Sequence, residues 1–305
     1  LFPRANLLHH PIIASDHAPI LLCTMGEARN TPKPFRFESM WTSDPSNFVV
    51  VKSAWSKQFV GTLAFCLSQK IIESKSSLKK WNIDVFGNIH FKIKTLTDQI
   101  DTIQDLPPSA SNFSSKNSIL CELNECMIRE DIHWRQKSRN QWLTSTNLNT
   151  RFFHLATIIR RRKIAIDFIK DENGTWLSGR HLVSDCFINY YKNLFTSQHT
   201  NPSHHINLSN IIPHSISSEE NEALCAIPSD DEIKSVAFSF ASSKSPGPDG
   251  MSAIFYKSYW GTVGKDVIAM VQSFFASGLM LKEMNHTFIT LIPKTPNPST
   301  VNNFR

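Results

Sequence analysis

Residues 244–250 read Lys-Ser-Pro-Gly-Pro-Asp-Gly, and this stretch decides the organisation of the C-terminal part of the chain. Two prolines and two glycines fall within five residues, and a helix cannot continue through them. A helix that begins near Asp230, within the capping-box pattern Ser229–Glu232, must therefore end at this turn. The prolines fix the backbone and the glycines allow close approach, so the turn forms a rigid ledge beside Lys244. Such a ledge suits a nucleic-acid backbone, although a plain turn between helices with a bystander lysine explains the same residues.

A second helix and a strand are predicted after the turn. An apolar stripe runs from Trp260 to Phe274 at helical spacing, and Gly278 marks the end of that helix. Residues Thr287 to Ile292 form a short apolar run that is typical of a strand, and the run leaves Lys294 at its end. The predicted order is helix, rigid turn, helix, short strand and exposed lysine.

A strongly basic helical segment lies upstream of this region. Between Arg151 and Lys170 there are six cations and one anion, Asp167, which gives a local net charge of +5. Arginines interleaved with aromatic residues favour contact with phosphates and stacked bases. A solvated charged face and a nuclear-import signal are the alternatives. The residues expected to contact nucleic acid here are Arg151, Arg160, Arg161, Arg162 and Lys163.

Helical periodicity accounts for most of the remaining chain. The helix that starts at Ser46 and the helix over Leu63–Trp81 are each expected to bury one apolar stripe, with Leu63 on the second stripe. The long helix with Leu120, Met127 and Trp142 is expected to bury its apolar side too. Further helices are expected over Ile89–Ile103 and Val183–Phe195, and a short one after the capping pattern of Ser217 and Glu220.

Two shorter features complete the local predictions. The Asn173-Gly174 pair tolerates the positive φ angles of a tight turn, so Ile164–Ile169 and Thr175–Leu177 are predicted to form a hairpin. The extended segment Pro32–Trp41 is rich in aromatic residues, which could stack on bases. Docking onto a neighbouring helix is the preferred interpretation, because aromatics near prolines usually fill surface grooves.

Near the N-terminus, Ile12 to Leu22 has the pattern of two short apolar strands around a polar turn that carries Ser15-Asp16-His17. A histidine held by a carboxylate can activate a water that attacks phosphate. A strand-end turn capped by Asp16 is the competing interpretation.

The overall composition narrows the class of protein to which the chain can belong. At 305 residues the chain is long enough for about two domains, and its apolar fraction of 41% is ample for a core. The net charge of +6 suits a polyanionic partner.

The six cysteines show no zinc-site spacing, so buried reduced thiols are expected, with Cys121 and Cys126 in packing roles. Four histidines at 199, 204, 205 and 214 are expected to be solvated rather than metal-bound. No signal peptide or membrane span is visible, which favours the nucleus or cytoplasm.

The turn KSPGPDG, the following FYKSYWGTVGKDVIAMVQSFFASG and the close TFITLIPKTPNPSTVNNFR together resemble the start of the reverse transcriptase domain of plant non-LTR (LINE-type) retrotransposons. The segment around Asp16 and His17 resembles the closing motif of the endonuclease/exonuclease/phosphatase superfamily, which supplies the nicking domain of these elements. By this resemblance Asp16 and His17 are nuclease residues. Lys294 and Arg305 would reach the triphosphate of the incoming nucleotide, and Lys244 would lie near the template.

The resemblance implies a fragment of a longer polyprotein, since the chain starts at Leu1 in mid-pattern. The expected fold is mainly α with short β elements, combining a helical linker with truncated polymerase fingers and the last strands of an α/β endonuclease sandwich. The expected segments are 1–30 (endonuclease remnant), 31–104 (helical connector), 105–118 (linker), 119–200 (basic helical region with hairpin), 201–228 (polar loop and short helix) and 229–305 (start of the reverse transcriptase fingers).

Polymerase chemistry needs two metal ions held by aspartates. The aspartate motifs of the family's palm do not occur in this sequence, so the chain is expected to be non-catalytic. It is expected to bind no metal or cofactor, although the parent polymerase uses Mg²⁺. Nucleic acid, as RNA template and DNA target, and the rest of the polyprotein are the expected partners. A helical protein-interaction module and a retroelement relic without function remain the alternatives.

Overall fold

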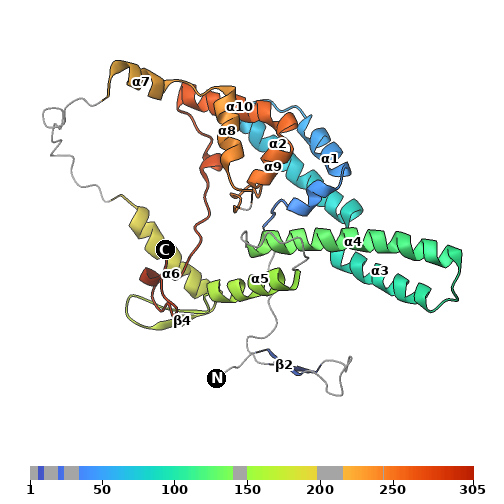
Figure 1. Ribbon diagram of the computed structural model, residues 1–305. Coiled ribbons are helices and arrows are strands. Elements are labelled where there is room, and N and C mark those ends of the chain that lie inside the picture. Colours follow the sequence, from blue (N-terminus) through green and yellow to red (C-terminus); the bar gives the residue numbers. More distant parts are fainter. Residues whose placement is uncertain (1–5, 10–19, 24–33, 140–149, 198–215, 243) are drawn as a thin grey trace. The chain divides into compact units, whose positions relative to one another are not determined.

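The computed structural model of the chain (Figure 1) describes residues 6–9, 20–23, 34–139, 150–197, 216–242 and 244–305. The chain divides into two units, Leu1–Phe35 and Arg36–Arg305. Most of the described residues are helical, and short antiparallel strand pairs accompany them. The predicted mainly α fold with short β elements is confirmed at that level.

The described part of the first unit is one antiparallel strand pair. Strand β1 covers Asn6–His9 and β2 covers Ile20–Cys23, with Asn6 opposite Cys23 and His9 opposite Ile20. The second strand predicted within Ile12–Leu22 is therefore present as β2. Its partner is β1, which lies upstream of Ile12. The intervening turn with Asp16 and His17 lies outside the described residues.

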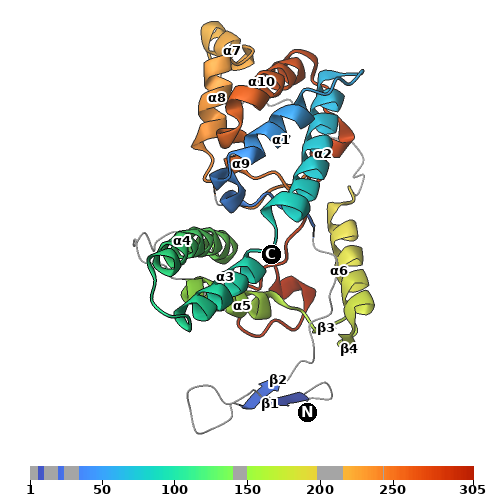
Figure 2. The ribbon, with the colours of Figure 1, turned by 90° about the vertical axis from the view of Figure 1, so that its right-hand side faces the viewer.

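The second unit contains a group of packed helices. Helices α1 and α2 pack together, α10 packs on both, and α8 and α9 lie against α10 (Figures 1 and 2). Their bounds are α1 Ser46–Trp55, α2 Leu63–Trp81, α8 Asp230–Ser239, α9 Ala253–Ser258 and α10 Trp260–Ser277.

The apolar stripes of α1 and α2 are buried, as predicted, and the two helices pack together. Val51 and Trp55 of α1 are buried, and so are Leu67 and Leu78 of α2. Leu63 was expected on the same stripe and is instead 49% exposed. It is the first residue of α2, just after the Thr62 cap, so it projects before the helix reaches its neighbours.

The aromatic segment before α1 docks onto α9, as preferred from the sequence. It ends in a short 3₁₀ helix, η1 Ser39–Ser43. Phe37 is 1% exposed and packs edge-on against Phe255 at 5.4 Å and Tyr259 at 6.0 Å between ring centroids. Its N–H donates to the Gly250 carbonyl at 2.9 Å, which ties this segment to the end of the proline-rich turn.

A second helical group follows α2, through the π-helical turn η2 Asn82–Phe86. The long helix α4 packs against both α3 and α5. The bounds are α3 Ile89–Gln104, α4 Ala110–Ser138 and α5 Thr150–Ile164. Helix α4 begins inside the segment expected as a linker, because Ser109 caps it by accepting the Asn112 N–H.

The predicted apolar stripe of α4 is wrong. Leu120 and Met127 are each 41% exposed, and the buried positions are Cys126, Asp131 and Ser138. Two neighbouring helices cover two sides of α4, so burial does not follow a single apolar stripe. Helix α4 ends at Ser138, and Trp142, predicted on the same helix, lies outside the described residues.

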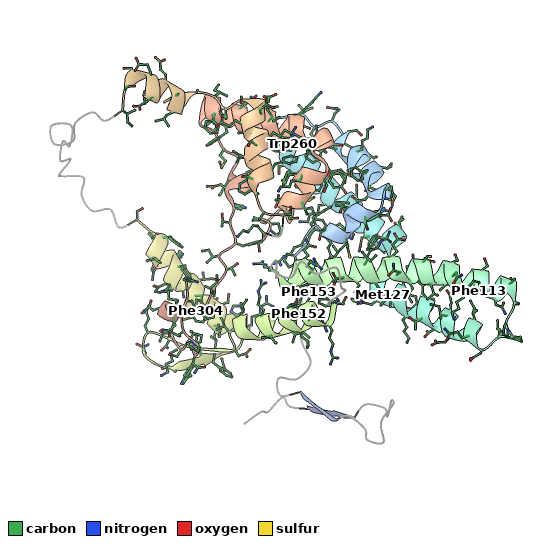
Figure 3. All side chains as sticks on the ribbon, in the orientation of Figure 1. Phe113, Met127, Phe152, Phe153, Trp260 and Phe304 are labelled. Carbon is green, nitrogen blue, oxygen red and sulfur yellow. The ribbon has the colours of Figure 1, made fainter. Side chains whose placement is uncertain are left out.

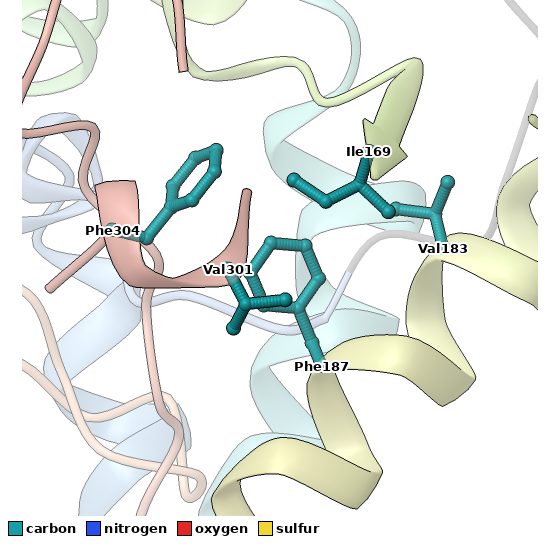
Figure 4. Packing of buried hydrophobic residues seen from close by; sticks show 5 residues of the cluster. All are labelled: Ile169, Val183, Phe187, Val301 and Phe304. Atoms are coloured by element: carbon teal, nitrogen blue, oxygen red, sulfur yellow. The ribbon is translucent and has the colours of Figure 1, made fainter. Parts of the chain in front are cut away.

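The predicted hairpin is present, with β3 Phe168–Lys170 paired to β4 Trp176–Ser178 and followed by α6 Arg180–Phe195. The C-terminal residues pack on it through the 3₁₀ helix η5 Val301–Asn303. Lys170 N–H donates to the Ser299 carbonyl at 2.7 Å. Figure 4 shows the core that this creates, formed by Ile169, Val183, Phe187, Val301 and Phe304.

The strand expected over Thr287–Ile292 is wrong. These residues are outside any strand, and the pairing begins only at an isolated bridge between Pro293 and Phe304. Ile292 exchanges backbone hydrogen bonds with Arg305, and Pro293 has no N–H to add a further bond. Within the described residues no segment pairs with residues 287–291, so no strand forms there.

Helix boundaries in the C-terminal part follow local signals. The Ser217 and Glu220 capping box starts α7 Ser218–Cys225 as predicted. Helix α8 has the Ser229 cap but ends at Ser239, before the proline-rich turn. Gly278 ends α10 with φ 69°, a conformation that suits glycine, as predicted. A 3₁₀ helix, η4 Lys282–Asn285, follows.

Free thiols are found at Cys66, Cys121, Cys126, Cys186 and Cys225. Burial is confirmed for Cys126, whereas Cys121 and Cys225 are exposed, so the packing role expected for Cys121 is wrong. Within the described ranges, no helix has the length and apolar character needed to cross a membrane.

Candidate nucleic-acid interface

The arginines predicted to bind nucleic acid lie on α5. Arg151 and Arg161 are exposed, and Arg160 is half-buried. Arg162 and Lys163 belong to the same helix, and their side chains lie outside the described part. Phe153 on α5 is fully buried and lies 5.2 Å from the Arg135 guanidinium, while its neighbour Phe152 is 40% exposed (Figure 3). The aromatic residues of this segment therefore serve mainly to fix α5 against α4.

Two further arginines lie in this region, and we call Arg36, Arg139 and Arg160 the arginine cluster. Arg160 Nη1 donates to the carbonyl of Ser138, the last residue of α4, at 3.4 Å. Arg139, the next residue, donates from Nη2 to the Ser245 hydroxyl on the proline-rich turn. Arg36 directly precedes Phe37, whose N–H holds the other end of that turn.

The positive charges of Arg160 and Arg36 both act on the Arg139 guanidinium. Partial burial and the positive charges of Arg160 and Arg36 lower the pKa of Arg139. Other arginines of α4 differ, because Arg129 pairs with Glu125 and Arg135 pairs with Asp131. Within the described ranges the arginine cluster has no carboxylate ion-pair partner.

The proline-rich turn is a tight, internally bonded structure. Gly250 has φ 80° and its N–H donates to the Gly247 carbonyl at 3.0 Å. The Asp249 carboxylate accepts the Met251 N–H at 3.2 Å, and Tyr256 Oη lies 3.4 Å from its other oxygen. Burial raises the pKa of Asp249. Lys244 is exposed at the start of the turn, so the ledge predicted from the sequence is present with its lysine facing solvent.

Lys294 and Arg305, predicted to bind nucleotide, are brought together at the C-terminal bridge. The N–H groups of Ile292 and Arg305 donate to each other's carbonyls at 2.9 and 3.0 Å. Lys294 N–H donates to the Asn303 carbonyl at 2.7 Å, and its Nζ donates to the Asn302 carbonyl at 3.1 Å. Both side chains are exposed. This pair sits on the hairpin and α6 rather than on the proline-rich turn.

A separate hollow of about 490 Å³ lies between η1, η2 and the facing sides of α3 and α4. His133 Nδ1 contacts Glu38 Oε2 at 2.6 Å, and Lys137 Nζ contacts His133 Nε2 at 2.6 Å. Burial would raise the pKa of Glu38, but the His133 hydrogen bond and the charges of His133 and Lys137 outweigh it, so that pKa is lowered. His90 pairs with Glu130 at 2.8 Å on the α3 side. The hollow therefore has internally paired charges.

Arg36 and Arg139 were not predicted as site residues. The only sequence signal for Arg139 was its place on a cationic helix face, and nothing in the sequence joins it to Arg36, about a hundred residues away. No group of His, Cys, Asp or Glu suited to a metal converges within the described ranges. The four loop histidines lie outside those ranges.

Comparison with known proteins gives one informative similarity. No protein-family model matches the chain. The chain is similar to the Transposon TX1 uncharacterized 149 kDa protein of Xenopus laevis, with 25% identity over 169 residues. The matched region covers 55% of this chain and 13% of that protein, so the chain corresponds to a small part of the relative's length.

Proposed function

We propose that the chain is a nucleic-acid-binding segment of a LINE-type retrotransposon polyprotein. The observation that carries this proposal is the arginine cluster. Arg139 contacts a hydroxyl oxygen and Arg160 a carbonyl oxygen, and within the described residues none of the three guanidinium groups pairs with a carboxylate. A set of positive charges without acidic partners is an electrostatic footprint for phosphates. Similarity to a protein named as a transposon product supports the origin.

The rest of the proposed assignment follows the motifs quoted above. Residues 1–30 are the end of an endonuclease domain, with Asp16 and His17 from its active site. Residues 229–305 are the start of reverse transcriptase fingers, with Lys244 near the template. Lys294 and Arg305, which flank the bridge between Pro293 and Phe304, are apt for a nucleotide triphosphate because both are long, exposed cations.

We assign no catalysis to this chain, because its sequence lacks the palm aspartates that two-metal phosphoryl transfer requires. Its proposed partners are RNA template, DNA target and the rest of the polyprotein. What this segment can do by itself is hold a phosphate backbone.

Filter binding with single-stranded RNA and single-stranded DNA across a salt series tests the proposal. We expect log K to fall linearly with log salt, with a slope of about −0.7 for each phosphate neutralised on a single strand. Binding that is absent at the lowest salt, or that does not change with salt, would remove the proposed function.

A protein-interaction module is the second candidate, and exposed aromatic side chains on the α3 and α4 pair favour it. Phe91 is 71% exposed and Phe113 is 67% exposed (Figure 3 labels Phe113). Sedimentation of the wild-type chain and of a Phe91→Ser, Phe113→Ser double variant distinguishes the protein-interaction candidate from the nucleic-acid-binding proposal. Self-association that disappears in the double variant, together with no nucleic-acid binding, would favour this candidate.

A further inference from the structure

Arg139 adopts a backbone conformation that arginine rarely takes. It has φ 59° and ψ 18° at the end of α4, and among the described residues every other positive φ belongs to a glycine. A side chain in this left-handed region is sterically strained, whereas glycine at the same position would not be. Strained residues of this kind concentrate at binding sites, where the surrounding structure keeps them in place.

The side chain of Arg139 is positioned, not neutralised. The Ser245 hydroxyl accepts one of its N–H groups, and a guanidinium has five such donors in a planar fork. Arg160 lies against the Ser138 carbonyl, whose carbon is bonded to the Arg139 nitrogen. Both arginines therefore lie at the C-terminal end of α4, and Arg139 also contacts the proline-rich turn.

The surroundings leave a surplus of positive charge at this place. The C-terminal end of α4 contributes about half a negative charge through its dipole, which offsets a fraction of three cations. The nearby carboxylates have other partners. Asp131 pairs with Arg135, Glu38 contacts His133, and Asp249 accepts the Met251 N–H.

We propose that Arg36, Arg139, Arg160 and the Ser245 hydroxyl form a phosphate site that holds one position of a nucleic-acid backbone against the proline-rich turn. This deepens the proposed function and rests on it. Guanidinium groups take phosphate oxygens in pairs, through parallel N–H donors, so arginines suit this task better than lysines. The rigid turn supplies a wall that needs no ordering when the backbone binds.

The first test compares charge-matched variants of the full chain in RNA filter binding. Arg139→Gln and Arg160→Gln should each weaken binding about tenfold, and together they should reduce the magnitude of the salt slope by about 1.4, or two phosphate contacts. The control carries Arg180→Gln and Lys192→Gln, which remove the same charge from exposed positions on α6. The control should weaken binding by less than about threefold.

The second test separates binding from folding. Arg139→Gly removes the side chain but keeps a residue suited to the left-handed conformation, so its melting temperature should not fall, while RNA binding should fall as in Arg139→Gln. Arg139→Lys, which retains charge without the planar fork, should bind between these and the wild type. Wild-type affinity in Arg139→Gly, or a double variant that binds like the α6 control, would overturn the site and leave the proposed function standing. If the wild-type chain itself does not bind RNA, both the phosphate site and the proposed function are overturned.

Discussion

Removing the Asp266 carboxylate should destabilise the fold by about 2–3 kcal/mol, because one of its oxygens joins α10 to both α1 and α2. Asp266 Oδ2 accepts the Trp55 indole N–H at 2.6 Å and the Lys70 ammonium at 2.9 Å. Trp55 is only 4% exposed, so Asp266→Ala leaves its N–H without an acceptor, which costs about 1–3 kcal/mol. The Asp266 side chain is 36% exposed, so the ion pair adds only about 0.2–1 kcal/mol.

Urea unfolding followed by circular dichroism measures this loss. With a slope of about 3 kcal/mol per molar urea, the midpoint should fall by about 0.7–1 M while the slope stays unchanged. The exposed pair Lys57 and Glu73 is the control, and Glu73→Ala should move the midpoint little because both groups are hydrated.

A double-mutant cycle identifies the interaction responsible. Trp55→Phe keeps an aromatic ring and removes the N–H donor. In the Trp55→Phe background, Asp266→Ala should lose only the contribution of the ion pair with Lys70. The two substitutions should therefore show a coupling energy of about 1–2 kcal/mol. If the two single losses simply add, the indole hydrogen bond does not join these helices and the reasoning is refuted.

Three further outcomes are expected from single substitutions. Phe37→Ala should lower the free energy of unfolding by about 3–5 kcal/mol in urea titration, since the ring is buried, whereas Phe288→Ala, at a side chain 63% exposed, should change it little. Because the folded-state pKa of Glu38 is lowered, its contribution is present above the ordinary value of 4.5 and is lost as pH falls through the folded value; Glu38→Gln should flatten this acid loss in melting curves recorded below pH 5. Gly278→Ala places a β-carbon at φ 69° and should cost about 1–2 kcal/mol, seen as a melting temperature lower by a few degrees; an unchanged value would contradict the glycine requirement.

Elements with strong local signals could be predicted from the sequence. The bounds of α2 match the predicted helix over Leu63–Trp81, and the Ser217 capping box and the Gly278 stop are found as expected. These features depend on residues that are neighbours in the chain, so no knowledge of the tertiary structure is needed to locate them.

Features that depend on a distant partner were missed. The apolar run Thr287–Ile292 looks like a strand, but a strand requires a paired neighbour, and among the described residues only Ile292 of this run is paired, with Arg305. The exposure of Met127 depends on where α3 and α5 lie, which the periodicity of α4 does not contain. The end of α4 at Ser138 was missed because Arg139, and not glycine, occupies the left-handed position.

The residues of the candidate site also differ in whether the sequence alone could identify them. Arg160 was predicted because the arginine run is visible in the sequence. Arg36 and Arg139 could be recognised only from the fold, which brings their segments to the proline-rich turn. The grouping of Lys294 with Arg305 also required the backbone pairing around Pro293.

The docking of Phe37 onto Gly250 and Phe255 has a consequence for synthesis of the chain. These contacts join residues more than 200 positions apart, and ribosomes add about 5–20 residues per second, so α9 is completed about 10–40 s after Phe37 is made. Throughout that interval Phe37 lacks Phe255 and Tyr259, and Trp55 lacks Phe255 and Asp266, against which they pack in the finished protein. The nascent polypeptide therefore presents an aromatic surface to chaperones, and the stable arrangement of its first helices is a late event of translation.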